Sequence, residues 1–190
     1  MPKIWKNSEF CDIMSNGKCR KEGFYMILNE FKCVETDVNL DEYLKLYSYV
    51  RNSMEHPAWL GTFEKNEILD ILNNGGKIWL YYDKENPVCS MFYMPVKNKT
   101  LRKHNIDFEE DLVGALGPIM VSPDYIGNGL QKQMMEVLDK YVLSIGKRYL
   151  FTKAHSDNVY SINNMLKDGY ELVHKYESER GSESAFIKKI

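Results

Sequence analysis

Two glycines before a helix are the first residues in this chain whose types and spacing could do chemistry. Gly127 and Gly129 stand between an apolar run and a strongly periodic helical segment. The first N–H groups of a helix lack partners and carry roughly half a positive charge, and glycine has no Cβ to keep a ligand away from the backbone. A pyrophosphate suits such a site. A tight turn that only caps the helix is the alternative interpretation.

Two familiar phosphate loops do not fit these residues. The Walker A loop ends in Gly-Lys-Ser/Thr, whereas Lys132 follows Gln131 and precedes Gln133. The dinucleotide-binding loop needs a third glycine at position 132, and that residue is the same lysine. A phosphate site here therefore has to be of another kind.

Pro118 interrupts the apolar run Leu112–Val121, where proline cannot donate a ladder hydrogen bond. This predicts a β-bulge, or a strand that separates from its neighbour. An opening between residues 119–121 and the following parallel strand, Arg148–Ala154, would expose main-chain groups that can pair with an extended, amide-bearing ligand. A pyrophosphate joined to an amide-rich arm describes coenzyme A.

Two segments, VSPDYIGNGLQKQMMEVL and DNVYSINNMLKDGYELV, resemble the signature regions of the GNAT (GCN5-related N-acetyltransferase) superfamily. The resemblance is strong over residues 110–176, and the order of elements from 24 to 96 agrees with it. The family's loop pattern, Gln/Arg-x-x-Gly-x-Gly/Ala, aligns on Gly129, with Ile126 and Gln131 departing from it. The resemblance implies the acyl-CoA N-acyltransferase fold, an α/β fold with a mixed, mostly antiparallel sheet of six to seven strands. A splayed central parallel pair and about four flanking helices belong to that fold.

The resemblance also implies acetyl-CoA as cosubstrate, with no metal. Asn158 and Ser161 match the family's Asn-x-x-Ala/Ser pattern, which implies a contact with the cofactor arm; an asparagine that only caps its helix is the alternative. The Ile119 amide would lie near the thioester carbonyl. The implied pyrophosphate residues and the residues beside the pantetheine are Gly127, Asn128, Gly129, Leu130, Gln131 and Lys132, and Ile119, Met120 and Val121.

Acetyl transfer would need a neutral amine, a stabilised oxyanion and a proton for the departing thiolate. In this family a Tyr seven residues after the Asn is a common general acid, and here that position holds Met165. We therefore consider three catalytic candidates. His155 ends the strand before Asn158, Glu110 could relay a proton through water, and Tyr160 is a substitute acid. Each also has an ordinary alternative role, structural for the histidine and solvation for the carboxylate.

The acceptor would enter between the first two helices, as is usual for this fold. His56 and Trp59 lie in the segment that separates those helices. An exposed Trp there would line a substrate pocket, although a Trp in a short loop is as often part of the core.

Alternating and helical patterns predict the elements that position these residues. Asn39 and Glu42 resemble a capping box for the first helix. The polar residues 97–111 separate two halves of one mixed α/β sheet. The predicted helices cover residues 40–54, 62–74, 130–145 and a capped segment around 156–169, and the predicted strands cover 24–28, 77–82, 88–96, 112–121, 148–154, 170–176 and 184–190.

The composition is that of a globular protein in one domain, residues 1–190, with residues 1–23 as an arm of uncertain order. The chain has 190 residues, 44% of them hydrophobic, and a net charge of −2, which argues against a nucleic-acid footprint or a polybasic membrane anchor. Its apolar runs fall far short of the roughly 20 residues of a membrane span, and its N-terminus has no apolar signal stretch. Four cysteines at irregular spacing are expected to be reduced thiols in a cytoplasmic protein.

Three hypotheses follow for the function. The first is a cytoplasmic enzyme that moves acetyl from acetyl-CoA to a primary amine of a small molecule or peptide, in a direct ternary complex. The second is an acyl-CoA-binding module of the same fold with little or no transfer activity, which the methionine at the usual acid position favours. The third is a plain α/β interaction domain whose glycines form only turns. A homodimer is common in the family.

Overall fold

The computed structural model describes residues 18–21, 24–27, 30–34 and 39–190, with side chains from residue 39 onward. A seven-stranded sheet has the order β3-β4-β5-β6-β7-β9-β8, and β1 and β2 form a separate two-stranded sheet. All pairings among the described strands are antiparallel except that of β6 with β7. The strands are β1 (Lys18–Lys21), β2 (Phe24–Ile27), β3 (Glu30–Val34), β4 (Lys77–Asp83), β5 (Asn86–Pro95), β6 (Val113–Val121), β7 (Tyr149–His155), β8 (Glu171–Ser178) and β9 (Gly181–Lys189).

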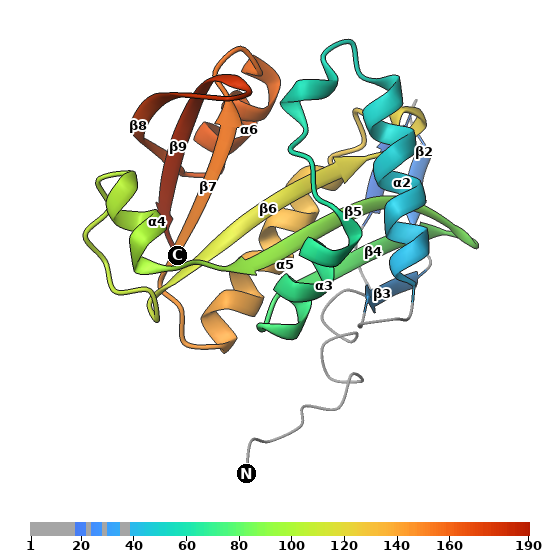
Figure 1. Ribbon diagram of the computed structural model, residues 1–190. Coiled ribbons are helices and arrows are strands. Elements are labelled where there is room, and N and C mark those ends of the chain that lie inside the picture. The colour runs from blue at the N-terminus through green and yellow to red at the C-terminus, as the bar shows by residue number, and fades with distance from the viewer. Residues whose placement is uncertain (1–17, 22–23, 28–29, 35–38) are drawn as a thin grey trace.

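Helices cover both faces of this sheet (Figure 1). α2 and α3 lie on one face, where Tyr43 and Ile68 pack with Phe92 of β5. α5 lies on the other face, where Met134 and Leu138 pack in a second core. The helices are α2 (Leu40–Ser53), η2 (Pro57–Trp59), α3 (Lys65–Asn73), α4 (Asn98–Lys103), η3 (Pro123–Tyr125), α5 (Leu130–Ser144) and α6 (Val159–Lys167). The predicted fold class, a mixed and mostly antiparallel sheet with one central parallel pair, is confirmed.

The clearest helical periodicity is confirmed as α5, whose buried residues include Leu130, Met134, Val137, Leu138 and Val142. These side chains recur every three to four residues and so form one apolar stripe facing the sheet. The stripe fixes the rotation of the helix about its axis. It thereby fixes where the first turn of α5 points.

The predicted capping box at the start of α2 is wrong. Asn39 has a left-handed backbone, with φ of 62°, and its side chain makes no cap hydrogen bond. Glu42 instead accepts a hydrogen bond from the Tyr82 hydroxyl on β4. The capping box belongs to α3, where Glu64 and Glu67 satisfy each other's backbone N–H groups.

Two further differences from the predicted elements lie outside the helices that cover the sheet. The polar segment 97–111 contains α4, which no hydrophobic periodicity marks. The strand predicted at residues 24–28 is β2 of the small sheet, whereas the edge of the large sheet is β3. The predicted N-terminal arm lies outside the described residues up to residue 17.

Gly114 is required by the packing of β6 against β5. A Cβ at this position would lie 2.7 Å from Cε2 of Tyr93, closer than carbon atoms normally approach. The residue is buried where β6 still pairs with β7, opposite Leu150. A side chain here would push the Tyr93 ring out of the core.

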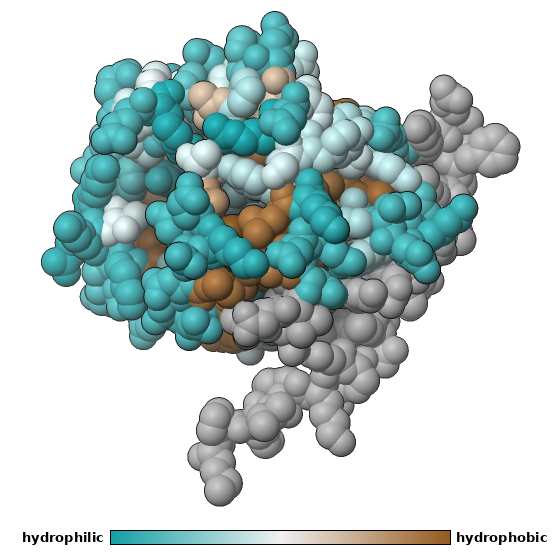
Figure 2. Space-filling view, turned by 45° about the vertical axis from the view of Figure 1, so that its right-hand side comes forward, coloured by the Kyte–Doolittle hydropathy of each residue, from teal (hydrophilic) through white to brown (hydrophobic). Residues whose placement is uncertain are grey.

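Hydrophilic side chains cover most of the face turned forward in Figure 2, around a band of apolar side chains near its centre. Among the described helices, none is long and apolar enough to cross a membrane. In the same part of the chain, no group of three or more His, Cys, Asp or Glu side chains is placed to hold a metal ion.

Candidate functional site

The parallel strands β6 and β7 pair for only three residues and then separate. Their register runs from Val113 opposite Tyr149 to Ala115 opposite Phe151. Beyond that point, the Thr152 hydroxyl on β7 donates to the main-chain carbonyl of Leu116 at 3.0 Å, a buried bond across the diverging strands. A side chain thus satisfies the first carbonyl that the ladder leaves unpaired. The predicted opening between the two strands is confirmed.

A β-bulge on the other side of β6 accompanies this opening. Ile119 pairs with Met91 and Leu116 pairs with Tyr93, so that two residues of β6 stand opposite one residue of β5. These two residues are Gly117 and Pro118, and the sequence predicts a bulge at this proline. A Cβ on Gly117 would lie 3.0 Å from the Phe92 carbonyl oxygen, so the bulge favours glycine for lack of space.

The chain leaves β6 at Val121 and enters α5 through two glycines with left-handed backbones. Gly127 has φ of +86° and Gly129, the residue before the helix, has φ of +72°. A Cβ at either position would meet nothing within 4 Å, so the backbone conformation, and not crowding, requires glycine there. Both residues are exposed, and the main chain of the loop is open to a ligand from outside.

The loop between β6 and α5 is anchored to the end of β4. The Tyr125 hydroxyl donates to Asp83 Oδ2 at 2.6 Å, and this hydrogen bond, with partial burial and the nearby carboxylate charge, raises the pKa of Tyr125 to about 12. Asn128 is buried, and its Nδ2 donates to the Tyr125 carbonyl at 3.0 Å. The first helical bond of α5 runs from the Gln133 N–H to the Gly129 carbonyl. The N–H groups of the three residues between these two therefore precede the helical ladder, as at any helix start.

Helix α6 contacts the first turn of α5. Asn164 Nδ2 donates to Gln131 Oε1 at 2.8 Å, which links the two helices. Asn158 caps α6, since its Oδ1 accepts from the Ser161 N–H at 3.1 Å. The structure thus brings the predicted cofactor residues of both segments to the same end of the sheet. The side-chain oxygen of Asn158 is engaged in the cap, which the sequence offered as the alternative role.

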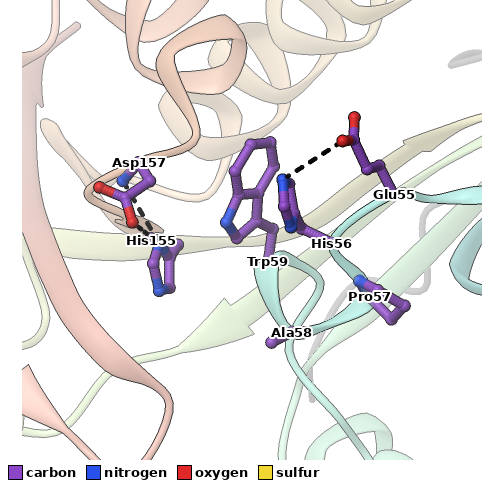
Figure 3. Close-up of a pocket in the computed structure, with 7 residues that line it drawn as sticks. All are labelled: Glu55, His56, Pro57, Ala58, Trp59, His155 and Asp157. Carbon is purple, nitrogen blue, oxygen red and sulfur yellow. Dashed lines mark hydrogen bonds and ion pairs between the residues drawn. The ribbon is translucent and has the colours of Figure 1, made fainter.

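A pocket of about 400 Å³ opens at the end of β7 (Figure 3). His155 meets there with residues from the α2–η2 segment, including His56 and Trp59, which the sequence singles out for the acceptor side. The indole of Trp59 stands between two imidazoles, with its ring centroid 4.5 Å from His56 and 6.2 Å from His155. The pocket is lined by Glu55, His56, Pro57, Ala58, Trp59, His155 and Asp157.

Both ring nitrogens of His155 face main-chain partners. Nδ1 lies 3.3 Å from the Asp157 N–H, and a nitrogen that accepts this proton must carry a lone pair. Nε2 lies 3.1 Å from the Arg180 carbonyl, and a nitrogen that bonds a carbonyl must carry the proton. These partners suit the tautomer that carries its proton on Nε2. In this arrangement His155 ties the end of β7 to the tip of the β8–β9 hairpin and is not poised to accept a proton.

A buried carboxylate, which the sequence does not reveal, holds the same hairpin tip. Glu183 of β9 is 3% exposed and lies opposite His155 in the register of β7 and β9. It accepts from the Tyr176 hydroxyl at 2.5 Å and pairs with Arg180. Burial and this hydrogen bond raise the pKa of Tyr176. Gly61 leaves room for the arginine, since a Cβ there would lie 2.9 Å from Arg180 Nη1.

The other two catalytic candidates are not brought to this pocket. Glu110 precedes β6 at the end opposite the opening, where its carboxylate accepts from the Asn98 N–H at 2.6 Å and caps α4. Nine residues of strand, roughly 26 Å at 3.3 Å per residue, separate the two ends of β6. Tyr160 is 76% exposed on α6 and is not among the lining residues. Met165, at the usual acid position, is buried in the core.

No protein-family model matches this chain, and no curated protein sequence matches it. Solved structures do, and three similar ones have TM-scores of 0.61 to 0.67. An acetyltransferase of the GNAT family from Listeria monocytogenes superposes with a TM-score of 0.67 at 15% identity, covering 92% of this chain and 100% of the other. This chain has the GNAT fold.

Two of the matching GNAT-fold structures contain the cofactor. The NatC complex bound to Gag peptide and CoA matches with a TM-score of 0.62 at 14% identity, covering 85% of this chain and 99% of that one. The structure of yncA from Salmonella typhimurium with its cofactor acetyl-CoA matches with a TM-score of 0.61 at 12% identity, covering 85% of this chain and 94% of the other. At these identities the likeness is one of fold alone.

Proposed function

We propose that this protein transfers an acetyl group from acetyl-CoA to a primary amine by direct attack in a ternary complex. The observation that carries the proposal is the opening between β6 and β7, which leads directly to the start of α5. The edge of residues 119–121 that faces β7 is unpaired, and the loop after β6 leads to a helix start, so the two features suit a cofactor with an amide arm and a pyrophosphate. The acetyl-CoA and CoA bound by structures of the same fold support it.

In the proposed complex the main chain does most of the binding. The N–H groups from Gly129 to Lys132 would hold the pyrophosphate, because they precede the helical ladder and lie at the positive end of the helix dipole. Residues Ile119 to Val121 would pair with the amides of the pantetheine as an added strand does. Backbone groups suffice for both tasks, so the unusual side chains Ile126 and Gln131 do not count against the site.

The Ile119 N–H is the proposed oxyanion donor. It follows the bulge at Gly117 and Pro118, where β6 turns away from regular pairing. A fixed backbone N–H aimed at the thioester oxygen stabilises the negative charge that develops there as the amine attacks. The carbonyl carbon gains a bond to nitrogen and loses its bond to sulfur. The thiolate then takes up a proton that the former amine has lost.

His155 is proposed as a positioning residue. Its ring fixes the hairpin tip through the Arg180 carbonyl, and that tip borders the acceptor side of the pocket. The proton of the ammonium would leave through solvent at the open pocket, since Met165 supplies no acid or base. Cytoplasmic location and a homodimer stay predictions.

Calorimetry and a thiol-release assay together test the proposal. We expect acetyl-CoA to bind, and free thiol to appear when a primary amine is added. If acetyl-CoA binds but no amine or peptide causes thiol release, the second candidate, an acyl-CoA-binding module, is favoured. The buried Met165 at the usual acid position supports that candidate. Absence of binding at millimolar acetyl-CoA would contradict both.

A further inference from the structure

The pocket at the end of β7 has carboxylates on two sides, and its basic side chains are the imidazoles of His56 and His155. Glu55 comes from the α2–η2 segment and Asp157 from the β7–α6 turn, and in Figure 3 they flank the indole of Trp59 on opposite sides. No Lys or Arg is among the described residues that line the pocket. Arg180, whose carbonyl bonds His155, has its guanidinium paired with the buried Glu183.

Neither carboxylate is paired with a permanent cation in the described part of the chain. Each has a histidine ring as its neighbour instead, at 4.0 Å for Glu55 and His56 and at 3.8 Å for Asp157 and His155. His155 Nδ1 accepts from the Asp157 N–H and so offers no proton to the Asp157 carboxylate. Both carboxylates are also largely exposed, at 90% for Glu55 and 79% for Asp157, and are open to a ligand of positive charge.

The wall between the carboxylates also suits a cation. An indole face attracts a positive charge within about 6 Å of its centre, more strongly than the other aromatic rings do. Trp59 is partly exposed at the pocket, and the two imidazoles beside it hold the indole in place. An alkyl chain lying across these rings could carry one charge toward each carboxylate.

We propose that the acceptor is an aliphatic diamine, a primary amine that carries a second positive charge at the other end of its chain. This inference rests on the proposed acetyl transfer. One ammonium loses a proton to solvent, and its nitrogen attacks the thioester carbon. The second ammonium stays charged beside the opposite carboxylate. The products are the monoacetylated diamine and the CoA thiol, which takes up the second proton from the reacting nitrogen.

Matched amines of equal chain length test the inference on the whole protein. Diaminoalkanes of three to five methylenes are compared with the corresponding monoamines by kcat/KM in the thiol-release assay. Exposed ion pairs are individually weak, so we expect the best diamine to exceed its monoamine by at least about fivefold, and 0.5 M salt to reduce that ratio.

Charge-removing variants locate the effect. Glu55→Gln and Asp157→Asn should each lower the diamine-to-monoamine ratio of kcat/KM. Glu85→Gln, an equally conservative change in the exposed β4–β5 turn, should leave the ratio unchanged. A ratio near one in the unmodified protein overturns the inference, and so does a ratio that both pocket variants leave intact.

Two outcomes separate this inference from the proposed function. Thiol release with monoamines or peptides, but without a preference for diamines, overturns the inference and leaves acetyl transfer standing. If none of the amines leads to thiol release, or if calorimetry detects no binding of acetyl-CoA, both the inference and the proposed function are overturned.

Discussion

Alanine at Gly129 is predicted to weaken acetyl-CoA binding far more than it weakens the fold. Gly129 has φ of +72° and lies at the start of α5, and Gly146 has φ of +84° and lies just after its end. An added Cβ would meet nothing within 4 Å at either position. The two glycines therefore form a matched pair with the same backbone strain at opposite ends of one helix.

The structural cost of the two substitutions should be similar. A left-handed backbone costs a non-glycine residue about 1–2 kcal/mol, and no steric term is added at either site. We expect Gly129→Ala and Gly146→Ala to lower the free energy of unfolding by that amount, measured by urea denaturation. The comparison removes strain as an explanation for any difference in binding.

Only Gly129→Ala, and not Gly146→Ala, should weaken the binding of acetyl-CoA. In the proposed complex the new methyl group would occupy the side of the loop that the pyrophosphate approaches. Loss of one charge-assisted hydrogen bond is worth about 1.5–3 kcal/mol, which corresponds to a Kd for acetyl-CoA about 10- to 100-fold higher. Calorimetry on both variants measures it. Equal Kd values for Gly129→Ala, Gly146→Ala and the unmodified protein would refute the placement of the pyrophosphate.

Three further predictions concern stability. Thr152→Val leaves the buried Leu116 carbonyl without its donor and should lower the free energy of unfolding by about 1–3 kcal/mol, as urea denaturation would show; a change below about 0.5 kcal/mol would mean that water replaces the hydroxyl. Burial, with the charges of nearby lysines and His174 adding to it, lowers the pKa of His104 to about 4. The unfolded chain therefore binds the proton first, and stability should fall by about 2 kcal/mol as the pH drops from about 6.5 to 4; His104→Phe should flatten this part of the pH profile if the reasoning holds. Lys188→Met leaves Asp139 and Asp168 without the ammonium that lies 2.6 and 2.7 Å from their carboxylates. It should lower the free energy of unfolding by about 3–5 kcal/mol in urea denaturation; an unchanged value would contradict this.

Periodicity predicts the parts of the fold that bury apolar surface. The helix over residues 130–144 and the strands on either side of it are confirmed because their side chains must face a core on one or both sides. Helix α4 lacks such a pattern, since Leu101 is its one buried residue. The capping box predicted for α2 is wrong because the Glu42 carboxylate accepts a hydrogen bond from Tyr82, a strand residue distant in sequence.

The cofactor side of the candidate site is visible in the sequence, and the acceptor side is only partly so. Proline and glycine within an apolar run have local consequences for the backbone, and Gly117 and Pro118 form the bulge that they indicate. Glu183 gives no such signal, because its burial depends on β9 pairing between β7 and β8. The engagement of both His155 nitrogens likewise depends on residues 157 and 180, and only the folded chain places them there.

A structure of the protein with acetyl-CoA bound tests the central claim most directly. Our account predicts the pyrophosphate within hydrogen-bonding distance of the N–H groups between Gly129 and Lys132. It also predicts the thioester oxygen about 3 Å from the Ile119 nitrogen, in the opening between β6 and β7. A cofactor bound elsewhere on the protein, with that opening empty, would contradict it.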